Sequence, residues 1–384
     1  MQPDGVELAD SAAAWSGAYV HVPFCARVCP YCDFNVVAGR DDLQHRYESA
    51  VLAEIEGEPA WRPLDSVAFG GGTPSRLPGR SLSAIVLAMR QRFGLVEGAE
   101  VSLEANPEDW SEPLAESLIA GGFNRVSFGA QSFDPGVLAD LGRLHDPADI
   151  ENGVNGARRA GFRSISLDLM FGTPGESMES WLGSVERALA LEPDHLSLYA
   201  LTVERGTALS RAIRDGAPAP DEDDQADKYE TAQELLAAAG FIRYEVSNFA
   251  RPGHACLYNL LTWAQGEYLA FGPGAHGHRA ASRYRNIHRL DAYLDAVEAG
   301  IRPEQGRDHP GSWEREQERL MLGLRRTAGA VAGCAGEALL ESEWGRRLVG
   351  AGVLGSFGGR IVVEKPLLGN DVARAVLALA PIDC

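Results

Sequence analysis

The sequence predicts an α/β protein whose core is a parallel β-sheet. Six times along the chain, a short apolar segment precedes a stretch with the apolar spacing of a helix. Parallel neighbours need crossover connections, which are usually helices, so this alternation favours a parallel sheet. A (β/α) barrel and a doubly wound open sheet share the alternation, and the pattern alone leaves both open.

The first predicted strand covers residues 18–24, and the first predicted helix covers residues 42–56. In this helix Leu43, Tyr47, Val51 and Ile55 recur at the spacing of one helical turn. The later strands are predicted at residues 66–74, 100–107, 124–133, 164–176 and 195–204. The helices that follow them are predicted at residues 81–92, 114–119, 137–141, 178–189 and 224–239.

Polar side chains gather at the C-terminal ends of the predicted strands. Thr73, Glu104, Gln131 and Asp168 each stand near the end of one strand, and the last strand ends near Ala200. In a barrel of parallel strands, this rim is where ligands bind. A carboxylate after an apolar strand, such as Glu104, is costly unless it meets a cation or a hydroxyl group, and a satisfied structural carboxylate is the alternative.

Three cysteines form a CxxxCxxC array directly after the first predicted strand: Cys25, Cys29 and Cys32. This spacing lets a loop curl around one inorganic centre, and thiolates are the ligands that iron and zinc accept readily. Three protein ligands leave one position open, which indicates chemistry rather than a closed structural site. A disulfide with a spare thiol, or a zinc ion completed by His21 or Asp33, remains an alternative.

Composition narrows the class of protein. The chain has 384 residues, of which 45% are hydrophobic, enough for one barrel and a small additional domain. Its formal net charge of −19 argues against a nucleic-acid partner and against unaided binding to anionic lipid. No apolar run reaches the length of about 20 residues that would span a membrane, and no secretory signal is visible. We therefore expect a cytoplasmic protein.

The residues around the cysteines carry a family resemblance. The segment YVHVPFCARVCPYCDFN resembles the cluster loop of radical S-adenosylmethionine (SAM) enzymes. Together with GGGTP at residues 70–74, it is similar to the oxygen-independent coproporphyrinogen III oxidase family and its haem-chaperone (HemW-type) branch. The resemblance implies a partial (β/α)6 radical SAM barrel, a [4Fe-4S] cluster on the three cysteines, and SAM on the fourth iron. It also implies an electron donor for the cluster, because one electron cleaves SAM to methionine and a 5′-deoxyadenosyl radical.

The resemblance further implies which residues contact SAM. Gly72 and Thr73 match the family's GGTP element, which lies against the methionyl amino group, and Tyr19 matches a position on the first strand. Arg143 suits a carboxylate because its guanidinium donates two parallel hydrogen bonds. The remaining implied contacts are Phe34, Glu104, Gln131, Asp168 and Ala200.

Two features distinguish the branches of the family. The oxidases carry a further cysteine two residues after the third ligand, where this chain has Phe34, which favours the haem-chaperone branch. That branch usually shows His-Asn-x-x-Tyr-Trp, whose histidine has been linked to haem. Here Asn259 and Trp263 match, but Tyr258 replaces the histidine and Thr262 replaces the tyrosine.

Several residues could replace that histidine as a haem ligand. Tyr258 could bind ferric haem as a phenolate, and His254, His276 and His278 lie near it in the sequence. The leading hypothesis is a HemW-like protein that binds a cluster, SAM and haem, with a haem-accepting protein as a further partner. The alternatives are a coproporphyrinogen III oxidase or another radical SAM enzyme, and a zinc-binding structural module, so enzymatic activity is left open.

The chain beyond the predicted units divides into further segments. Residues 1–17 are small and polar, and we interpret them as a flexible leader to a barrel over residues 18–250. Residues 251–305 are expected to form an extension over the barrel. Residues 306–384, with a helix around Leu320 and Leu324 and a strand at 361–364, indicate a small helical, winged-helix-like domain. A winged helix suggests DNA, but the acidic balance argues against it.

Overall fold

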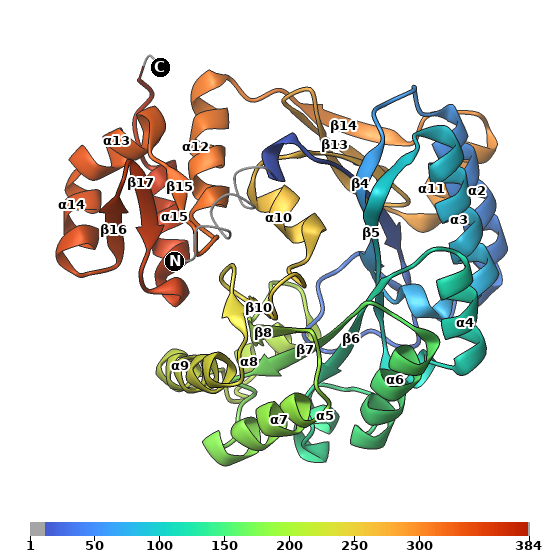
Figure 1. Ribbon diagram of the computed structural model, residues 1–384, viewed down its shortest axis with the longest axis horizontal. Coiled ribbons are helices and arrows are strands. Elements are labelled where there is room, and N and C mark those ends of the chain that lie inside the picture. The colour runs from blue at the N-terminus through green and yellow to red at the C-terminus, as the bar shows by residue number, and fades with distance from the viewer. Residues whose placement is uncertain (1–11, 383–384) are drawn as a thin grey trace.

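The structure is a computed structural model that describes residues 12–382 (Figure 1). Within these residues, twelve strands form one large sheet in the order β14-β13-β12-β11-β1-β4-β5-β6-β7-β8-β10-β9. The strands from β1 to β8 in this order are parallel and follow one another without a reversal. A doubly wound sheet would reverse its order at a switch point, so the partial (β/α)6 barrel is confirmed.

The predicted strand-and-helix units are present. The parallel strands are β1 (Ser16–Val22), β4 (Leu64–Gly71), β5 (Leu95–Ala105), β6 (Arg125–Gln131), β7 (Ser164–Phe171) and β8 (His195–Ala200). The predicted helices are α2 (Gln44–Gly57), α3 (Gly79–Arg92), α4 (Glu112–Ala120), α5 (Pro135–Asp140), α7 (Met178–Ala190) and α9 (Glu222–Ala238). Short 3₁₀ turns occur at Asp41–Leu43, Pro74–Arg76, Pro107–Asp109 and Pro366–Leu368.

Within residues 18–250, two helices were not expected from the sequence, α6 (Pro147–Ala160) and α8 (Ala208–Arg214). Helix α6 starts with a capping box on Asp146, but Gly153 and Gly156 interrupt its apolar pattern. These glycines bring the helix close to the sheet, since a Cβ on Gly153 would lie 3.1 Å from the Phe128 ring. Helix α8 has only seven residues and none of them is fully buried, so its apolar pattern, Leu209 and Ile213, is too short to indicate a helix.

The two faces of the parallel sheet differ in chemistry. Residues such as Val67, Leu103 and Phe128 point outward into the core beneath the helices. The alternate positions point inward and carry serines, namely Ser66, Ser102, Ser127, Ser166 and Ser197. In an ordinary (β/α) barrel, these inner positions are filled by branched apolar side chains. The interior of this barrel is therefore polar.

Hydrogen bonds organise that polar interior at the N-terminal ends of the strands. The two ring nitrogens of His195 lie 2.8 Å from Ser166 Oγ and 2.9 Å from Tyr244 Oη. Arg125 Nη1 lies 3.7 Å from Glu100 Oε2, and both side chains are buried. These buried polar groups have hydrogen-bond or ion-pair partners. Polar side chains can therefore occupy the inside of the barrel in place of apolar ones.

The segment after the barrel extends the sheet instead of wrapping around it. It contains α10 (Leu257–Trp263), β11 (Glu267–Phe271), β12 (His276–Arg279), β13 (Ser282–Asn286), α11 (Leu290–Glu298) and β14 (Glu304–Asp308). Strand β11 pairs with β1, which would otherwise be an open edge. Strand β14 also continues past the boundary expected at residue 305. At the other edge lie β10 (Asn248–Ala250) and β9 (Ile242–Arg243).

The C-terminal region forms a separate core, at the left of Figure 1. Its elements are α12 (Ser312–Gly323), β15 (Ala330–Val331), α13 (Gly333–Glu341), α14 (Glu343–Gly350), β16 (Leu354–Phe357), β17 (Arg360–Val363) and α15 (Gly369–Leu377). The strands form a small antiparallel sheet in the order β15-β17-β16. The region thus contains helices and a small sheet, and its winged-helix-like character stays a prediction.

The expected leader is shorter than residues 1–17. Residues 1–11 lie outside the described part, so the expectation stands untested there. For residues 12–17 the prediction of a flexible leader is wrong, because a 3₁₀ turn covers Ala12–Ala14 and β1 already begins at Ser16. The backbone N–H of Ser16 donates to Asp65 Oδ2 at 2.8 Å. The sequence pattern did not indicate the first part of β1, because the residues there are small or polar.

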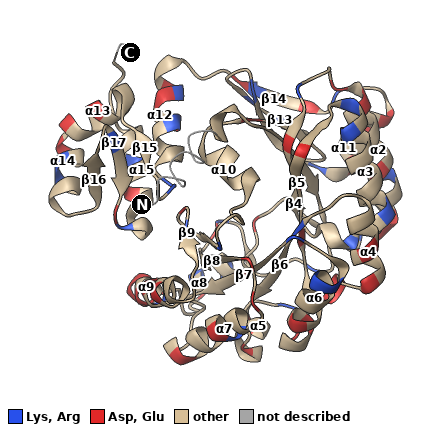
Figure 2. Ribbon diagram, viewed as in Figure 1, with Lys and Arg blue, Asp and Glu red and all other residues tan. Residues whose placement is uncertain are grey.

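Charged residues are frequent on the outer helices, and Figure 2 marks many acidic ones there. This distribution agrees with the net charge of −19. Among residues 12–382, no helix combines the length and apolar character that a membrane span requires.

One buried carboxylate joins the extension to the barrel. Glu54 on α2 accepts hydrogen bonds from the Gly272 backbone (2.9 Å), Asn286 Nδ2 (2.6 Å) and Tyr293 Oη (2.6 Å). These donors follow β11, end β13 and lie in α11 respectively. Burial raises the pKa of Glu54 to about 7 despite these donors. The extension is thus fixed to α2 by one titratable group.

We predict that Glu54 makes stability depend on pH near neutrality. Its folded pKa of about 7 lies above the unfolded value of about 4.3, so its contribution is complete below about pH 4.3 and falls as pH rises through 7. Unfolding free energies of wild type and Glu54→Gln should therefore differ by an amount that changes by up to about 3 kcal/mol between pH 5 and 8. The exposed neighbour Glu56→Gln is the control. A constant difference would contradict the prediction.

Candidate functional site

A cavity of about 390 Å³ opens at the C-terminal ends of the parallel strands. This volume lies within the range of small-molecule sites. Its wall includes Cys25, Cys29 and Cys32 from the cluster loop. It also includes most residues implied as SAM contacts, namely Phe34, Gly72, Thr73, Glu104, Gln131, Arg143, Asp168 and Ala200. The structure therefore brings the cysteines and these residues to one place.

Backbone hydrogen bonds hold the cluster loop against the strand ends. The loop is closed by β2 (Phe24–Cys25) and β3 (Val37–Ala38), which pair with each other. The N–H groups of Gly72 and Thr73 donate to Val22 O (2.7 Å) and Phe24 O (2.8 Å). A Cβ on Gly72 would lie 2.8 Å from both carbonyl oxygens, so only glycine allows this approach.

The cysteine thiols lie in surroundings that suit a metal cluster. Cys25 Sγ is 3.5 Å from Thr73 Oγ1, and Arg143 Nη1 is 3.8 Å from Cys29 Sγ. Burial raises the pKa of Cys25 to about 11 and also raises that of Cys32. A bound metal would replace the thiol protons at this cost, and three half-buried thiols on one loop are a donor set that fits iron. Within residues 12–382, no three His, Cys, Asp or Glu side chains converge on the position of a single metal ion.

Arg143 lies in the loop after α5, lines the cavity and hydrogen-bonds to other residues of the cavity wall. Its Nη2 donates to Asn106 Oδ1 (2.5 Å) and to Gly129 O (3.0 Å). Asn106 Nδ2 in turn donates to Thr73 Oγ1 at 3.2 Å, beside Cys25. The buried Nε of Arg143 has no hydrogen-bond partner among the described residues, which leaves a donor for an acidic ligand.

Asn106 was missed by sequence reasoning, although it follows Glu104 in the same strand-end segment. It was included in the strand predicted at residues 100–107 and was given no role of its own. An amide can donate and accept at once, and this property lets Asn106 link Arg143 to Thr73.

Two carboxylates face the cavity without a direct ion pair in the described part of the chain. Glu104 accepts from the Gly71 backbone at 3.2 Å, and Asp168 accepts from Ser127 Oγ at 2.9 Å. Glu104 is exposed to the cavity, and the loss of bulk water there, with a further contribution from the charge of Asp168, raises its pKa to about 7. Burial also raises the pKa of Asp168. Their arrangement favours a ligand with positive charge and hydroxyl groups.

Gln131 adds a strained backbone to the rim. Its φ of 63° is left-handed, and the pairing of β6 with β7 shifts register between Phe128 and Gln131. Such a conformation costs of order 1 kcal/mol or more and is common at ligand sites. The kink turns Gln131 toward the cavity that it lines.

Tyr19 and Tyr258 lie behind the cavity wall. Tyr19 does not line the cavity but lies close enough to Glu104 for that charge to raise its pKa, after the larger effect of burial. Its ring stacks on Tyr258 with centroids 5.8 Å apart, and Tyr258 meets Tyr268 edge-on at 5.6 Å. Burial raises the pKa of Tyr258 well above its ordinary value, so its phenolate form is costly.

His254, another haem candidate, is not among the residues that line the cavity. Its Nδ1 is 3.8 Å from Asp194 Oδ1, and Asp194 directly precedes β8. The N-terminal end of β8 is opposite the end that lines the cavity. The structure therefore does not bring His254 together with Tyr258.

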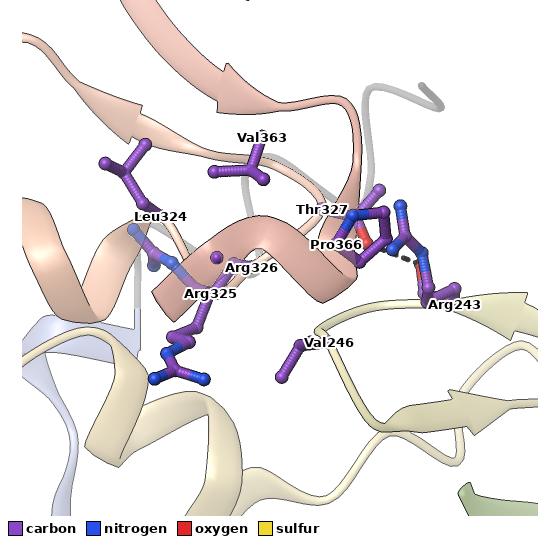
Figure 3. A pocket seen from close by; sticks show the side chains of 9 residues that line it. Arg243, Val246, Leu324, Arg325, Arg326, Thr327, Val363 and Pro366 are labelled. Atoms are coloured by element: carbon purple, nitrogen blue, oxygen red, sulfur yellow. Dashed lines mark hydrogen bonds between the residues drawn. The ribbon is translucent and has the colours of Figure 1, made fainter. Parts of the chain in front are cut away.

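A second, much smaller pocket lies where the C-terminal region meets the hairpin of β9 and β10 (Figure 3). Its volume is about 10 Å³, which holds roughly one water molecule. Thr327 Oγ1 donates to Arg243 O across it at 3.0 Å. This pocket is a joint between two parts of the fold and is too small for an organic ligand.

Comparisons with known proteins agree with the site. The radical SAM superfamily model matches residues 19–188. The "Heme chaperone HemW" of Mycobacterium tuberculosis is 39% identical over 373 residues, covering 94% of each chain. That of Bacillus subtilis is 34% identical over 81% of this chain and 84% of its own. The mouse "Radical S-adenosyl methionine domain-containing protein 1, mitochondrial" is 37% identical over 85% of this chain and 71% of its own.

Among solved structures, the Escherichia coli coproporphyrinogen III oxidase HemN superposes with a TM-score of 0.81. It covers 98% of this chain and 93% of its own at 22% identity, which supports the shared fold alone. The sequence relatives, by contrast, are similar enough to establish descent. The chain therefore belongs to the radical SAM superfamily and, within it, to the family of the haem chaperone HemW.

Proposed function

We propose that this chain holds a [4Fe-4S] cluster with Cys25, Cys29 and Cys32, binds SAM beside it and carries haem. The observation that supports this most directly is the cavity, where the thiols share a wall with Glu104 and Arg143. A reduced cluster with SAM bound would supply the electron that cleaves SAM. The protein would then need an electron donor, and the reducing cytoplasm suits its free thiols.

The residues of the cavity have complementary roles toward SAM. Glu104 and Asp168 offer carboxylates to its positively charged groups and hydroxyls, and Arg143 offers its free Nε to the carboxylate. Gly72 keeps side-chain atoms away from the ligand. Gln131, Ala200 and Phe34 complete the wall, and Tyr19 supports it from behind.

The haem part of the proposal rests on the family. The relatives are named haem chaperones, and Phe34 stands where the oxidases have a further cysteine. We therefore favour haem carriage, with transfer to an accepting protein, over oxidation of coproporphyrinogen. Release of 5′-deoxyadenosine only when coproporphyrinogen III is present would favour the enzyme instead.

We predict an iron–sulfur cluster with about four iron and four sulfide per chain after anaerobic reconstitution. Cys29→Ser should abolish the brown colour and most of the bound iron, because a ligand is lost. Cys334→Ser, in the C-terminal region, should keep both and serves as the control. Metal and sulfide analysis decides the matter, and one zinc per chain without sulfide would refute the cluster.

We predict that SAM binds more tightly as pH rises through about 7. Glu104 has a raised pKa near this value, and its ionised form is the one that attracts a cation. Glu104→Gln should lower the affinity at pH 8 by about 10-fold or more and flatten the pH profile. Anaerobic calorimetry on cluster-loaded protein measures both effects. Glu116→Gln on the exposed face of α4 is the control, and an unchanged profile in Glu104→Gln would exclude this role.

We predict that the cluster-loaded protein binds one haemin per chain at micromolar concentration, with a shifted Soret band. Tyr258→Phe and His254→Ala test two of the four ligands suggested by the sequence. Because Tyr258 is enclosed by rings and His254 lies at the opposite end of the strands, we expect neither change to alter the spectrum. The absence of any spectral change in wild type would end the proposal that the chain carries haem.

A further inference from the structure

In the described part of the chain, the extension over residues 251–305 contributes no residue to the wall of the cavity. That wall consists of the cluster loop, the C-terminal ends of β4, β5, β6, β7 and β8, and the loop after α5. The extension nevertheless contacts the cluster loop, because Asn35 of this loop is hydrogen-bonded to it. Any contribution of the extension to the site must therefore pass through contacts behind the wall.

Asn35 connects the cluster loop to the extension with both hydrogens of its amide. It lies three residues after Cys32 and directly after Phe34, which lines the cavity. Its Nδ2 donates to Pro273 O at 3.0 Å and to His288 O at 2.7 Å. Both acceptors are backbone carbonyls of the extension, one before β12 and one after β13. An amide nitrogen has only two hydrogens, so Asn35 uses both on the extension.

The backbone of the extension leaves room for this amide at Gly274. This residue has a left-handed φ of 73°, and a Cβ there would lie 2.5 Å from Asn35 Nδ2. The N–H of Gly274 donates to Ile287 O at 2.9 Å, which closes the base of the hairpin. Glycine adopts this backbone conformation without strain. A side chain at position 274 would fit only if the Asn35 amide moved and lost its two hydrogen bonds.

The backbone of Asn35 is held on its other side by β1. His21 Nε2, near the end of this strand, is 2.8 Å from Asn35 O. His21 is buried, and its own carbonyl accepts from Tyr47 Oη at 2.7 Å. A Cβ on Gly272, whose N–H donates to Glu54, would lie 2.5 Å from the same carbonyl. The segment after the third cysteine is thus enclosed between β1 and the extension.

The two sides of the cluster loop are held by different parts of the chain. On the N-terminal side, backbone N–H groups that follow β4 donate to carbonyl groups just before Cys25. On the other side, the first hydrogen bonds after Cys32 to a distant part of the described chain are those of Asn35. Strand β3, which follows, is only two residues long. The position of the segment that carries Cys32 and Phe34 therefore depends on Asn35.

We propose that Asn35 is a positioning residue for the cluster and for SAM, and that the extension is the support to which it is attached. This inference rests on the proposed function and gives the extension a role in the same site. Asn35 does not line the cavity, so it acts through Cys32 and Phe34, which do. Loss of supporting contacts around metal ligands typically costs about 10-fold to 100-fold in metal affinity.

Two variants of the full chain remove this contact from opposite sides. Asn35→Asp keeps the size of the side chain but turns carboxylate oxygens toward two carbonyl oxygens, and Gly274→Ala places a methyl group where the amide lies. Both keep the three cysteines, so both should take up as much iron and sulfide as wild type. They should then lose iron to a chelator about 10-fold faster and bind SAM about 10-fold more weakly. Asn155→Asp, exposed on α6, is the control.

A double variant separates this contact from a general loss of structure. Asn35→Ala removes the amide, so Gly274→Ala should have little further effect on iron loss in that background. The left-handed backbone at position 274 is the same in both backgrounds, and its strain cancels in the comparison. Amide hydrogen exchange of the cluster-free protein gives a second measurement. Residues 32–36 should exchange faster in Asn35→Asp than in wild type, whereas β6 should exchange at the same rate.

The outcomes distinguish this inference from the proposed function. If wild type takes up no iron and sulfide, the proposed function fails and this inference with it. If wild type holds a cluster, but Asn35→Asp and Gly274→Ala lose iron and bind SAM as wild type does, the proposed function stands and Asn35 has no positioning role. Additive effects of Asn35→Ala and Gly274→Ala would also overturn the inference, because the two residues would then act independently.

Discussion

The site depends on one close approach between backbones. Gly72 and Thr73, after β4, donate to the carbonyl groups of Val22, the last residue of β1, and Phe24, the first residue of β2. These bonds fix the cluster loop over the strand ends and place Cys25 beside Thr73. Asn106 hydrogen-bonds to both Thr73 and Arg143, so the position of Arg143 also depends on this arrangement. A larger residue at position 72 would move the loop that holds the cysteines, and every contact beyond it would shift.

The sequence predicted the parallel strands, most helices and the place of the site, because these follow from local patterns. Apolar periodicity marks strands and helices, and the ends of parallel strands must meet at one rim. The cysteines, Glu104 and Asp168 were found in this way. Helix α6 was missed because its glycines replace apolar residues where the helix approaches Phe128.

Other features could not be predicted because they depend on contacts between distant segments. The pairing of β11 with β1 joins residues that are about 250 positions apart, and no local pattern specifies it. The role of Asn106 depends on where Arg143 lies. Tyr258 and His254 are neighbours in the sequence, yet the fold turns one toward Tyr19 and the other toward Asp194.

The polar interior of the barrel has a thermodynamic consequence. Exposure of apolar surface raises the heat capacity of a protein on unfolding, and exposure of polar surface lowers it. Here the inner face of the sheet contributes serines, His195 and the Arg125–Glu100 pair instead of branched hydrocarbons. The stability of this chain should therefore vary less steeply with temperature than that of a barrel of equal length with a hydrocarbon-filled centre. The directional bonds inside also allow few alternative packings, which keeps the rim above them in one shape.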